Sequence, residues 1–173
     1  MKTILVPTDF SKNAMCALRY AIRLAAVTNA DIYVLHCFQY SSYKHLVSES
    51  ETQRKLIIEQ TGKEQLLKLQ KHVYKAYKSA GLPVSTATRL QAEFNPFVVE
   101  ESIRVAKKIH AGLIVMGTHG ATGIQKVLFG SNTANMVAKS PLPVLAIPGN
   151  HRYKPPKKLL FCSDLAHFNT EVA

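Results

Sequence analysis

The sequence predicts an α/β fold, an open five-stranded parallel sheet with helices on both faces, of the Rossmann-like kind. Short apolar runs, typical of strands buried on both faces, alternate along the chain with longer segments whose apolar residues recur at helical spacing. This alternation favours parallel strands joined by right-handed crossover helices. The 173 residues are enough for one such domain with a substantial core, but not for two complete ones.

The first half of the chain is expected to form two strands and two helices. Residues 2 to 6 are typical of a buried strand, which ends at Pro7, and Ser11 is a natural cap for the helix that follows. Small apolar residues recur along that helix, so it can lie close to a sheet. A turn at residues 28 to 31 leads into a second strand at residues 32 to 38. A long helix is predicted over roughly residues 51 to 80.

The second half is expected to add three strands and two helices. Residues 84 to 90 alternate apolar side chains with Thr and Ser, which is typical of an exposed edge strand, and residues 91 to 95 are predicted to be a loop. Pro96 suits the start of a helix. Residues 113 to 116 form the next apolar strand, residues 132 to 139 the last helix, and residues 144 to 147 the last strand.

The segment from Leu113 to Thr133 contains residues suited to binding an anion. The apolar strand is followed by Gly117 and Gly120, where the absence of Cβ permits a sharp turn and close approach of a ligand. Further on, Gly130 precedes Ser131, which is expected to cap the last helix. A helix N-terminus attracts phosphate because its N–H groups lack partners. A tight turn plus a helix cap would use the same residues without a ligand, and the spacing alone does not decide between the two.

Two better-known phosphate-binding motifs are absent from the sequence. No segment has the spacing of a Walker loop, and the three glycines from Gly117 onward do not follow the dinucleotide fingerprint or a first strand.

Gly117, Gly120, Gly130 and Ser131 instead match, without a gap, the Gly-x2-Gly-x9-Gly-Ser signature of the ATP-binding branch of the universal stress protein family. The segment Ile-Leu-Val-Pro-Thr-Asp-Phe-Ser at residues 4 to 11 resembles that family's first strand and turn, and the similarity extends to Pro148. The resemblance implies the strand order 3-2-1-4-5. The turn after the first strand would then lie beside Gly117, where the strand order reverses.

The resemblance also implies that ATP binds at the carboxyl ends of the first and fourth strands, with Mg²⁺ held mainly by the phosphates. The first turn would contact the adenosine, and residues at the ends of the second and fourth strands would flank the adenine. Backbone and hydroxyl groups around the glycines and the last helix would bind the phosphates. The expected site residues are Pro7, Thr8, Asp9, Cys37, Met116, Gly117, His119, Gly120, Gly130, Ser131, Asn132 and Thr133.

Several of these residues also have an ordinary structural interpretation. Asp9 suits an Asx turn or a helix cap, and Cys37 and Met116 suit a hydrophobic core. A histidine in a turn, such as His119, commonly faces solvent. No catalytic residues are expected, because neither a Gly-x-Ser-x-Gly elbow nor a His-Glu-x-x-His motif is present. Slow ATP hydrolysis stays open.

Composition sets limits on location and partners. No apolar run approaches the roughly 20 residues of a membrane span. Three widely spaced cysteines form neither a disulfide framework nor a zinc pattern, which favours the cytoplasm. The formal net charge of +11 is explained first by solubility and second by an anionic partner. Nucleic-acid binding ranks last, because no basic motif interleaved with aromatic residues is present.

The sequence therefore predicts a cytoplasmic stress-response protein that binds ATP and uses occupancy as a signal. The alternatives are an interaction module with the same fold that binds no nucleotide, and a nucleic-acid-binding domain. A homodimer is expected through the edge strand Val144 to Ile147, since exposed edges pair readily and the resemblance implies a dimer there.

The end of the chain resembles its beginning. Residues 157 to 165 repeat, at an offset of 155, the charged start, apolar strand and Ser/Thr-Asp turn of residues 2 to 10. We therefore expect a tandem arrangement with a nucleotide-binding domain at residues 1 to 148, a Pro- and Lys-rich linker at 149 to 156, and the truncated start of a second domain at 157 to 173.

Overall fold

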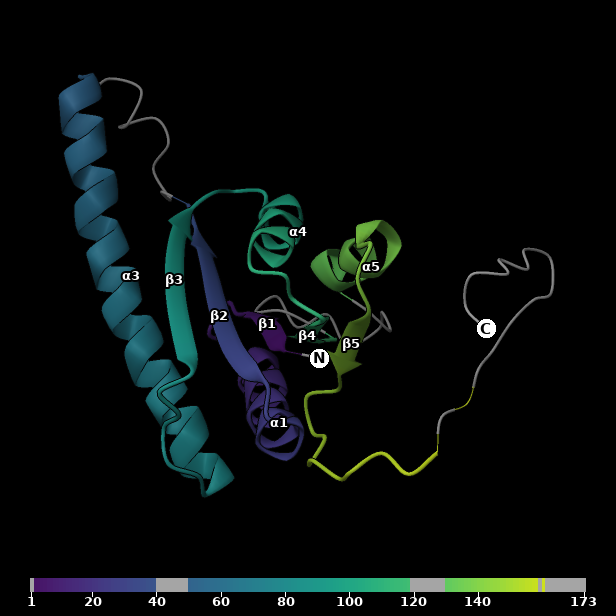
Figure 1. Ribbon diagram of the computed structural model, residues 1–173. Helices are drawn as coiled ribbons and strands as arrows, with labels where there is room; N and C mark the ends of the chain where they lie inside the picture. The colour runs from purple at the N-terminus through teal and green to yellow at the C-terminus, as the bar shows by residue number, and fades with distance from the viewer. Residues whose placement is uncertain (1, 40–49, 119–129, 159, 161–173) are drawn as a thin grey trace.

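The fold is built on one five-stranded, all-parallel sheet, seen in the computed structural model, which describes residues 2–39, 50–118, 130–158 and 160 (Figure 1). The strand order is β3-β2-β1-β4-β5, as the resemblance implied, and the predicted fold class is confirmed. The bounds of the strands are β1 (Thr3–Pro7), β2 (Asp31–Phe38), β3 (Thr88–Phe94), β4 (Leu113–Gly117) and β5 (Val144–Ile147).

In the described ranges, two helices cover each face of the sheet. Helices α1 (Lys12–Thr28) and α3 (Glu51–Ala80) pack on one face, where Ile4, Val6 and Val34 join them in one core cluster. Helices α4 (Val98–Lys108) and α5 (Ser131–Lys139) pack on the other face, where Leu5, Leu35 and Ile114 belong to a second cluster. Neighbouring residues of a strand point to opposite faces, so the apolar runs of β1 and β2 serve both clusters.

Helix α1 begins and ends where its sequence requires. Ser11 adopts an extended conformation and its hydroxyl accepts the Ala14 N–H at 3.1 Å, which confirms the predicted cap. Asn29 ends the helix in the left-handed conformation, with φ of 50°. Ala17 and Ala21 on this helix are fully buried, so the helix lies close against the sheet.

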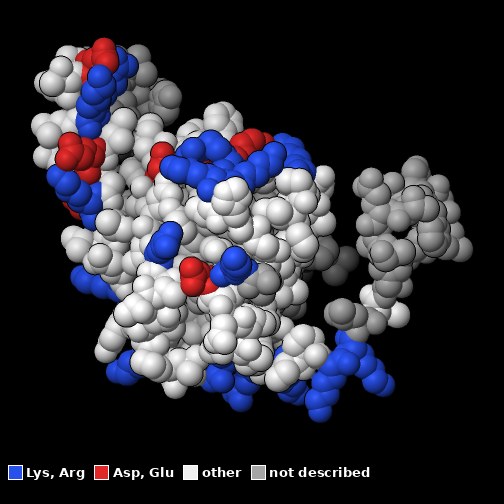
Figure 2. Space-filling model, viewed as in Figure 1, with Lys and Arg blue, Asp and Glu red and all other residues white. Residues whose placement is uncertain are grey.

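Helix α3 is longer than the sheet that it covers. Its buried residues all lie between Leu69 and Ala80, whereas the half that begins at Glu51 projects beyond the sheet (Figure 1). Figure 2 shows side chains of both charge signs on this projecting half. Ser50 and Gln53 form a capping box at its start. No helix in the described ranges has the length and apolar character that crossing a membrane requires.

Strand β3 lies further along the chain than the sequence predicted. Residues 84 to 87 precede the strand, and residues 91 to 94, predicted to be a loop, belong to it. The reason is a local turn at Ser85. Its carbonyl accepts the Thr88 N–H at 3.1 Å and its hydroxyl accepts the Ala87 N–H at 3.2 Å. These hydrogen bonds fold the alternating Val/Thr/Ser segment back on itself, so pairing with β2 starts only at Thr88.

Gly117 brings the first turn of α1 against the end of β4. A Cβ on Gly117 would lie 2.9 Å from the backbone carbon of Asn13 and 3.0 Å from its backbone oxygen. The helix backbone occupies the space that a side chain would need. This glycine is therefore explained by packing between a helix and a strand, in addition to any role toward a ligand.

The chain continues to pack on α1 after β5. The Cys16 thiol donates to the carbonyl of His151 at 3.0 Å and contacts the carbonyl of Pro148 at 3.4 Å. The rings of Tyr20 and Tyr153 meet edge to face, with centroids 5.0 Å apart. The first half of the predicted linker thus contacts the domain. The domain boundaries themselves stay a prediction, because residues 161 to 173 of the expected repeat lie outside the described residues.

Replacing Gly117 with Ala is expected to lower the free energy of unfolding by about 1–3 kcal/mol, because the new Cβ must displace the backbone of α1. Denaturant unfolding measures this change. Gly62→Ala is the matched control. There the new Cβ meets the Phe38 ring at 3.6 Å, an ordinary contact within a helix, so stability should rise slightly. Equal stability of Gly117→Ala and the parent would contradict the packing explanation.

Candidate functional site

The carboxyl ends of β1 and β4 lie side by side and carry most of the predicted site residues. The two strands are paired, with Leu5 opposite Ile114. Thr118, just beyond β4, donates its N–H to the Ile147 carbonyl at 3.0 Å, and its own carbonyl accepts the Gly130 N–H at 2.7 Å. The start of α5 is therefore attached directly to the end of β4.

The N-terminus of α5 lacks a side-chain cap. The predicted cap, Ser131, is instead the first helical residue, and Gly130 holds the cap position with extended backbone angles, φ of −65° and ψ of 157°. Gly130 has no side chain to accept the first N–H groups, and the first turn holds no acidic residue. Ser131 and Asn132 are exposed. Among the described residues, no side chain caps this positive end of the helix dipole, which suits an anionic ligand.

Thr133 has a different role from the one predicted. It is 2% exposed, and its hydroxyl donates to the Gly117 carbonyl at 2.8 Å. A hydroxyl has one proton to donate, so that proton holds α5 to β4 and is not directed to a phosphate. Among the hydroxyl groups predicted to bind phosphate, only that of Ser131 is exposed.

The turn after β1 presents Asp9 at the same edge of the sheet. Pro7 and Thr8 are buried, whereas Asp9 is exposed. The Asp9 carboxylate accepts the Ser11 N–H at 3.0 Å, which is the Asx-turn interaction considered from the sequence. The turn is tight enough to give Phe10 a φ of 63°. Asp9 thus has a structural role and also an exposed carboxylate at the sheet edge.

Cys37 and Met116 lie on the face covered by α4 and α5, packed in that core cluster. Burial, together with the nearby carboxylates of Glu101 and Glu93, raises the pKa of the Cys37 thiol to about 12. The thiol is therefore neutral at physiological pH and suits packing rather than nucleophilic chemistry. His119 and Gly120, the other predicted phosphate-binding residues, lie outside the described residues.

Two buried histidines hold the turn after β1, and the sequence interpretation did not select them. His36 on β2 places Nδ1 2.8 Å from the Thr8 carbonyl, so this nitrogen carries the proton that is donated. His72 on α3 places Nε2 3.4 Å from the Thr8 hydroxyl. The Phe10 ring lies 4.2 Å from the His36 ring and 5.3 Å from the His72 ring. Two separate elements, β2 and α3, therefore position the turn that carries Asp9.

Both imidazoles favour the neutral form. Burial lowers the pKa of His36, and although the Thr8 carbonyl and Asp9 oppose this effect, Lys68 adds to it. Burial also lowers the pKa of His72, with Asp9 opposing and Lys75 and His36 adding. His36 and His72 lie far apart in the sequence and form no motif, so only the fold reveals that they meet.

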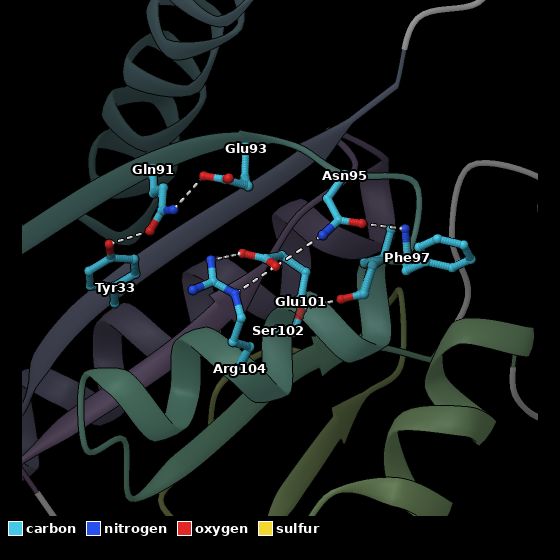
Figure 3. Close-up of polar contacts among 9 residues, drawn as sticks. Tyr33, Gln91, Glu93, Asn95, Phe97, Glu101, Ser102 and Arg104 are labelled. Carbon is cyan, nitrogen blue, oxygen red and sulfur yellow. Dashed lines mark hydrogen bonds and ion pairs between the residues drawn. The ribbon is translucent and has the colours of Figure 1, made fainter. Parts of the chain in front are cut away.

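A polar network fixes the place where β3 leads into α4 (Figure 3). Glu101 is 4% exposed and accepts hydrogen bonds from Asn95 at 3.0 Å and from Arg104 at 2.9 Å. The Arg104 hydrogen bond is the main cause that lowers the pKa of Glu101. The side-chain oxygen of Asn95, Oδ1, accepts the Phe97 N–H at 2.9 Å. The buried carboxylate is thus satisfied, and it anchors the rim of the carboxyl edge.

A second hydrogen-bonded chain runs along β2 and β3 on the same face. The Tyr33 hydroxyl donates to Gln91 at 2.6 Å, and the Gln91 amide donates to Glu93 at 2.7 Å (Figure 3).

No group of three or more His, Cys, Asp or Glu side chains that could hold a metal ion occurs in the part of the chain that the structure describes.

The histidine pair is expected to make stability depend on pH. The unfolded chain binds protons on these histidines near the ordinary pKa of 6.5, whereas the folded chain binds them only at lower pH. The free energy of unfolding should therefore be highest above pH 6.5 and fall as the pH is lowered through and below that value. Urea unfolding at a series of pH values measures the slope.

The double variant His36→Gln, His72→Gln should lose much of this slope, whatever its absolute stability. His110→Asn, at an exposed histidine, should keep it. A parent protein whose stability is constant from pH 7 to pH 5 would rule out the histidine pair as a buried, neutral unit.

Comparison with known proteins identifies the family. The model of the universal stress protein family matches residues 1–148. Universal stress protein MJ0531 of Methanocaldococcus jannaschii is 30% identical over 157 residues, which are 91% of this chain and 84% of that protein.

Solved structures agree with the sequence comparison. That of MJ0577, with 27% identity, superposes with a TM-score of 0.62 over 88% of this chain and 98% of that one. A universal stress protein in complex with cAMP, at 22% identity, has the same fold, with a TM-score of 0.60 over 84% of this chain and 96% of that one. With the family model covering the whole of the described domain, the chain belongs to the universal stress protein family.

Proposed function

We propose that this protein binds an adenine nucleotide, ATP with Mg²⁺, at the carboxyl edge formed by β1, β4 and the start of α5, and that occupancy serves as a signal in a stress response. The observation that carries the proposal is the uncapped N-terminus of α5, attached to the end of β4. It supplies N–H groups and a positive dipole end at the edge where ligands of open α/β sheets bind.

The chemistry of the edge suits the two ends of a nucleotide. The Ser131 hydroxyl and the first-turn N–H groups can donate to phosphate oxygens, and no carboxylate on the first turn repels them. The exposed Asp9 carboxylate can accept hydrogen bonds from ribose hydroxyls. In this proposal Mg²⁺ is bound chiefly by the phosphates, which accords with its preference for few protein ligands.

Two further observations support the proposal. A solved universal stress protein with this fold is in complex with cAMP. Cys16 and Cys37 are free thiols, which suits the reducing cytoplasm, where we propose that the protein acts.

The second candidate is an interaction module that binds no nucleotide. Two observations favour it: the backbone of Asn13 occupies the space beside Gly117, and the Thr133 hydroxyl is committed to the Gly117 carbonyl. Packing alone therefore accounts for part of the glycine-hydroxyl signature. Native mass spectrometry of the purified protein distinguishes the two candidates, because a nucleotide-binding protein is expected to retain nucleotide and the module is not.

Ser131→Asp is expected to weaken ATP binding at least tenfold while leaving the domain folded. A carboxylate in the first turn of α5 interacts favourably with the helix dipole, so stability should hold, but it repels phosphate from the same N–H groups. Isothermal titration with Mg²⁺ and ATP measures the affinity, and a thermal melt measures stability.

Gln70→Glu, on the exposed surface of α3, is the matched control because it changes the net charge by the same amount. It should bind ATP like the parent. Equal affinity for the parent and Ser131→Asp would show that the α5 terminus is not the phosphate site.

We also propose a homodimer through the outer edge of β5. The carbonyls of Pro143 and Ile147 accept hydrogen bonds from the β4 side, from Ile114 and Thr118. In a regular strand the intervening residues, Val144 and Ala146, then direct their N–H and carbonyl groups outward. In the described part of the chain no strand pairs with this row. A row of this kind is a template for a second strand, and two copies of the edge are self-complementary.

Ala146→Pro is expected to convert a dimer into a monomer, because proline removes an outward N–H without removing a hydrogen bond to β4. Sedimentation velocity over a wide concentration range measures the mass. Ala146→Val, which keeps the N–H group, should remain dimeric. A parent protein that is monomeric throughout would refute this interface.

A further inference from the structure

A cavity lies on the α1 side of the domain. Its walls are the middle of α1, the C-terminal end of α3 and the segment that follows β5. Its volume is about 540 Å³, within the range of small-molecule sites, and its walls include Arg19, Arg23, His151, Arg152, Tyr20 and Tyr153. None of the residues proposed for nucleotide binding belongs to these walls.

The charged side chains of the cavity are all cationic. They are those of Arg19, Arg23 and Arg152, and no aspartate or glutamate lines the cavity. Within the described ranges, Arg19 and Arg152 form no ion pair or hydrogen bond through their side chains, whereas Arg104 and Lys139 each contact a glutamate. Like charges gathered in a concave site repel one another, and a bound anion would remove that repulsion.

Contacts between the residues that line the cavity hold its walls in place. Arg23 donates to the Ala80 carbonyl at 2.7 Å, at the end of α3. The Cys16 thiol holds the backbone of His151, and the Tyr153 ring packs on Tyr20. The segment after β5, which the sequence alone suggested to be a linker, is therefore fixed as one wall. A site whose walls are already ordered loses less conformational entropy when a ligand binds.

The surroundings of the cavity are basic as well. Figure 2 shows Lys and Arg side chains along the lower rim, below α1 and along the chain beyond β5, with no Asp or Glu side chain visible among them. Lys154, Lys157 and Lys158 belong to the exposed chain that leaves this wall. Part of the excess of basic residues behind the net charge of +11 is therefore gathered around this cavity, and the carboxyl edge does not explain it. Such a field attracts anions over a distance of about a Debye length.

We propose that this cavity binds a compact oligophosphate, a group of adjacent phosphoryl units such as inorganic tripolyphosphate or the polyphosphate group of a small metabolite. Guanidinium groups match phosphate oxygens with paired hydrogen bonds, and several of them around one concave volume suit several phosphates in a row. The concave shape suits a small ligand rather than a nucleic-acid duplex. The proposal is independent of ATP binding at the carboxyl edge.

Isothermal titration of inorganic tripolyphosphate into the full chain tests the proposal. The parent is expected to bind it, and Arg19→Gln and Arg152→Gln each to weaken binding by about tenfold, since each removes a charge-assisted hydrogen-bonding group. Arg23 is left unchanged because it supports the end of α3. Amide chemical shifts in the parent should change at residues 19–23 and 149–153, and not at the start of α5.

Arg54→Gln, which removes an exposed arginine from the far end of α3, is the charge-matched control and should bind within twofold of the parent. The proposal is overturned if the parent does not bind tripolyphosphate, if Arg54→Gln weakens binding as much as the cavity variants, or if the shifts map to the carboxyl edge. It is also overturned if the cavity variants lose affinity for random duplex DNA while tripolyphosphate does not bind. Amide shifts at residues 19–23 and 149–153 that respond at lower concentrations of tripolyphosphate than of a nucleoside triphosphate would identify a free inorganic chain as the ligand. The reverse order at these same residues would identify a metabolite, and both results support the oligophosphate site.

Discussion

The close contact between the first turn of α1 and the end of β4 is the constraint on which the carboxyl edge depends. At Gly117 the backbone of Asn13 takes the place of a side chain, so α1 begins directly beside β4. The turn that leads from β1 into α1 therefore also lies beside the end of β4. On the other face, Thr133 attaches α5 to the same glycine through its carbonyl. One residue without a side chain therefore joins three elements at the edge where a ligand is proposed to bind.

The predictable parts of the fold were those with strong local signals. Apolar runs located β1, β2, β4 and β5, and Ser11 located the start of α1. Prediction was wrong at β3, because the alternation of residues 84 to 90 imitates a strand while Ser85 forms a turn. It was wrong by one residue at α5. The sequence suggested Ser131 as the N-cap, whereas in the structure Gly130 is the N-cap and Ser131 is the first helical residue.

The sequence predicted which strand ends lie together at the candidate site, but not the contacts that support them. The glycine-serine spacing pointed to the ends of β1 and β4, which the strand order does bring together. Nothing in the spacing indicated that Thr133 bonds Gly117, or that His36 and His72 meet at Thr8. Those contacts join residues 16 to 64 positions apart, and side chains at such separations carry no local pattern. The family resemblance suggests which residues form the candidate site, whereas the tertiary structure shows which contacts position them.

The projecting half of α3 has a consequence for how cooperatively the molecule unfolds. A helix that rests on a core melts with the core, but one without that support depends on its own backbone hydrogen bonds, its cap and its neighbouring charges. Here those are the Ser50 capping box and the exposed pairs Glu51–Lys55 and Glu59–Lys63. The amide protons of this half should exchange with solvent through local fraying, far faster than those between Leu69 and Ala80. Helix α3 is thus one continuous element in shape and two units in stability.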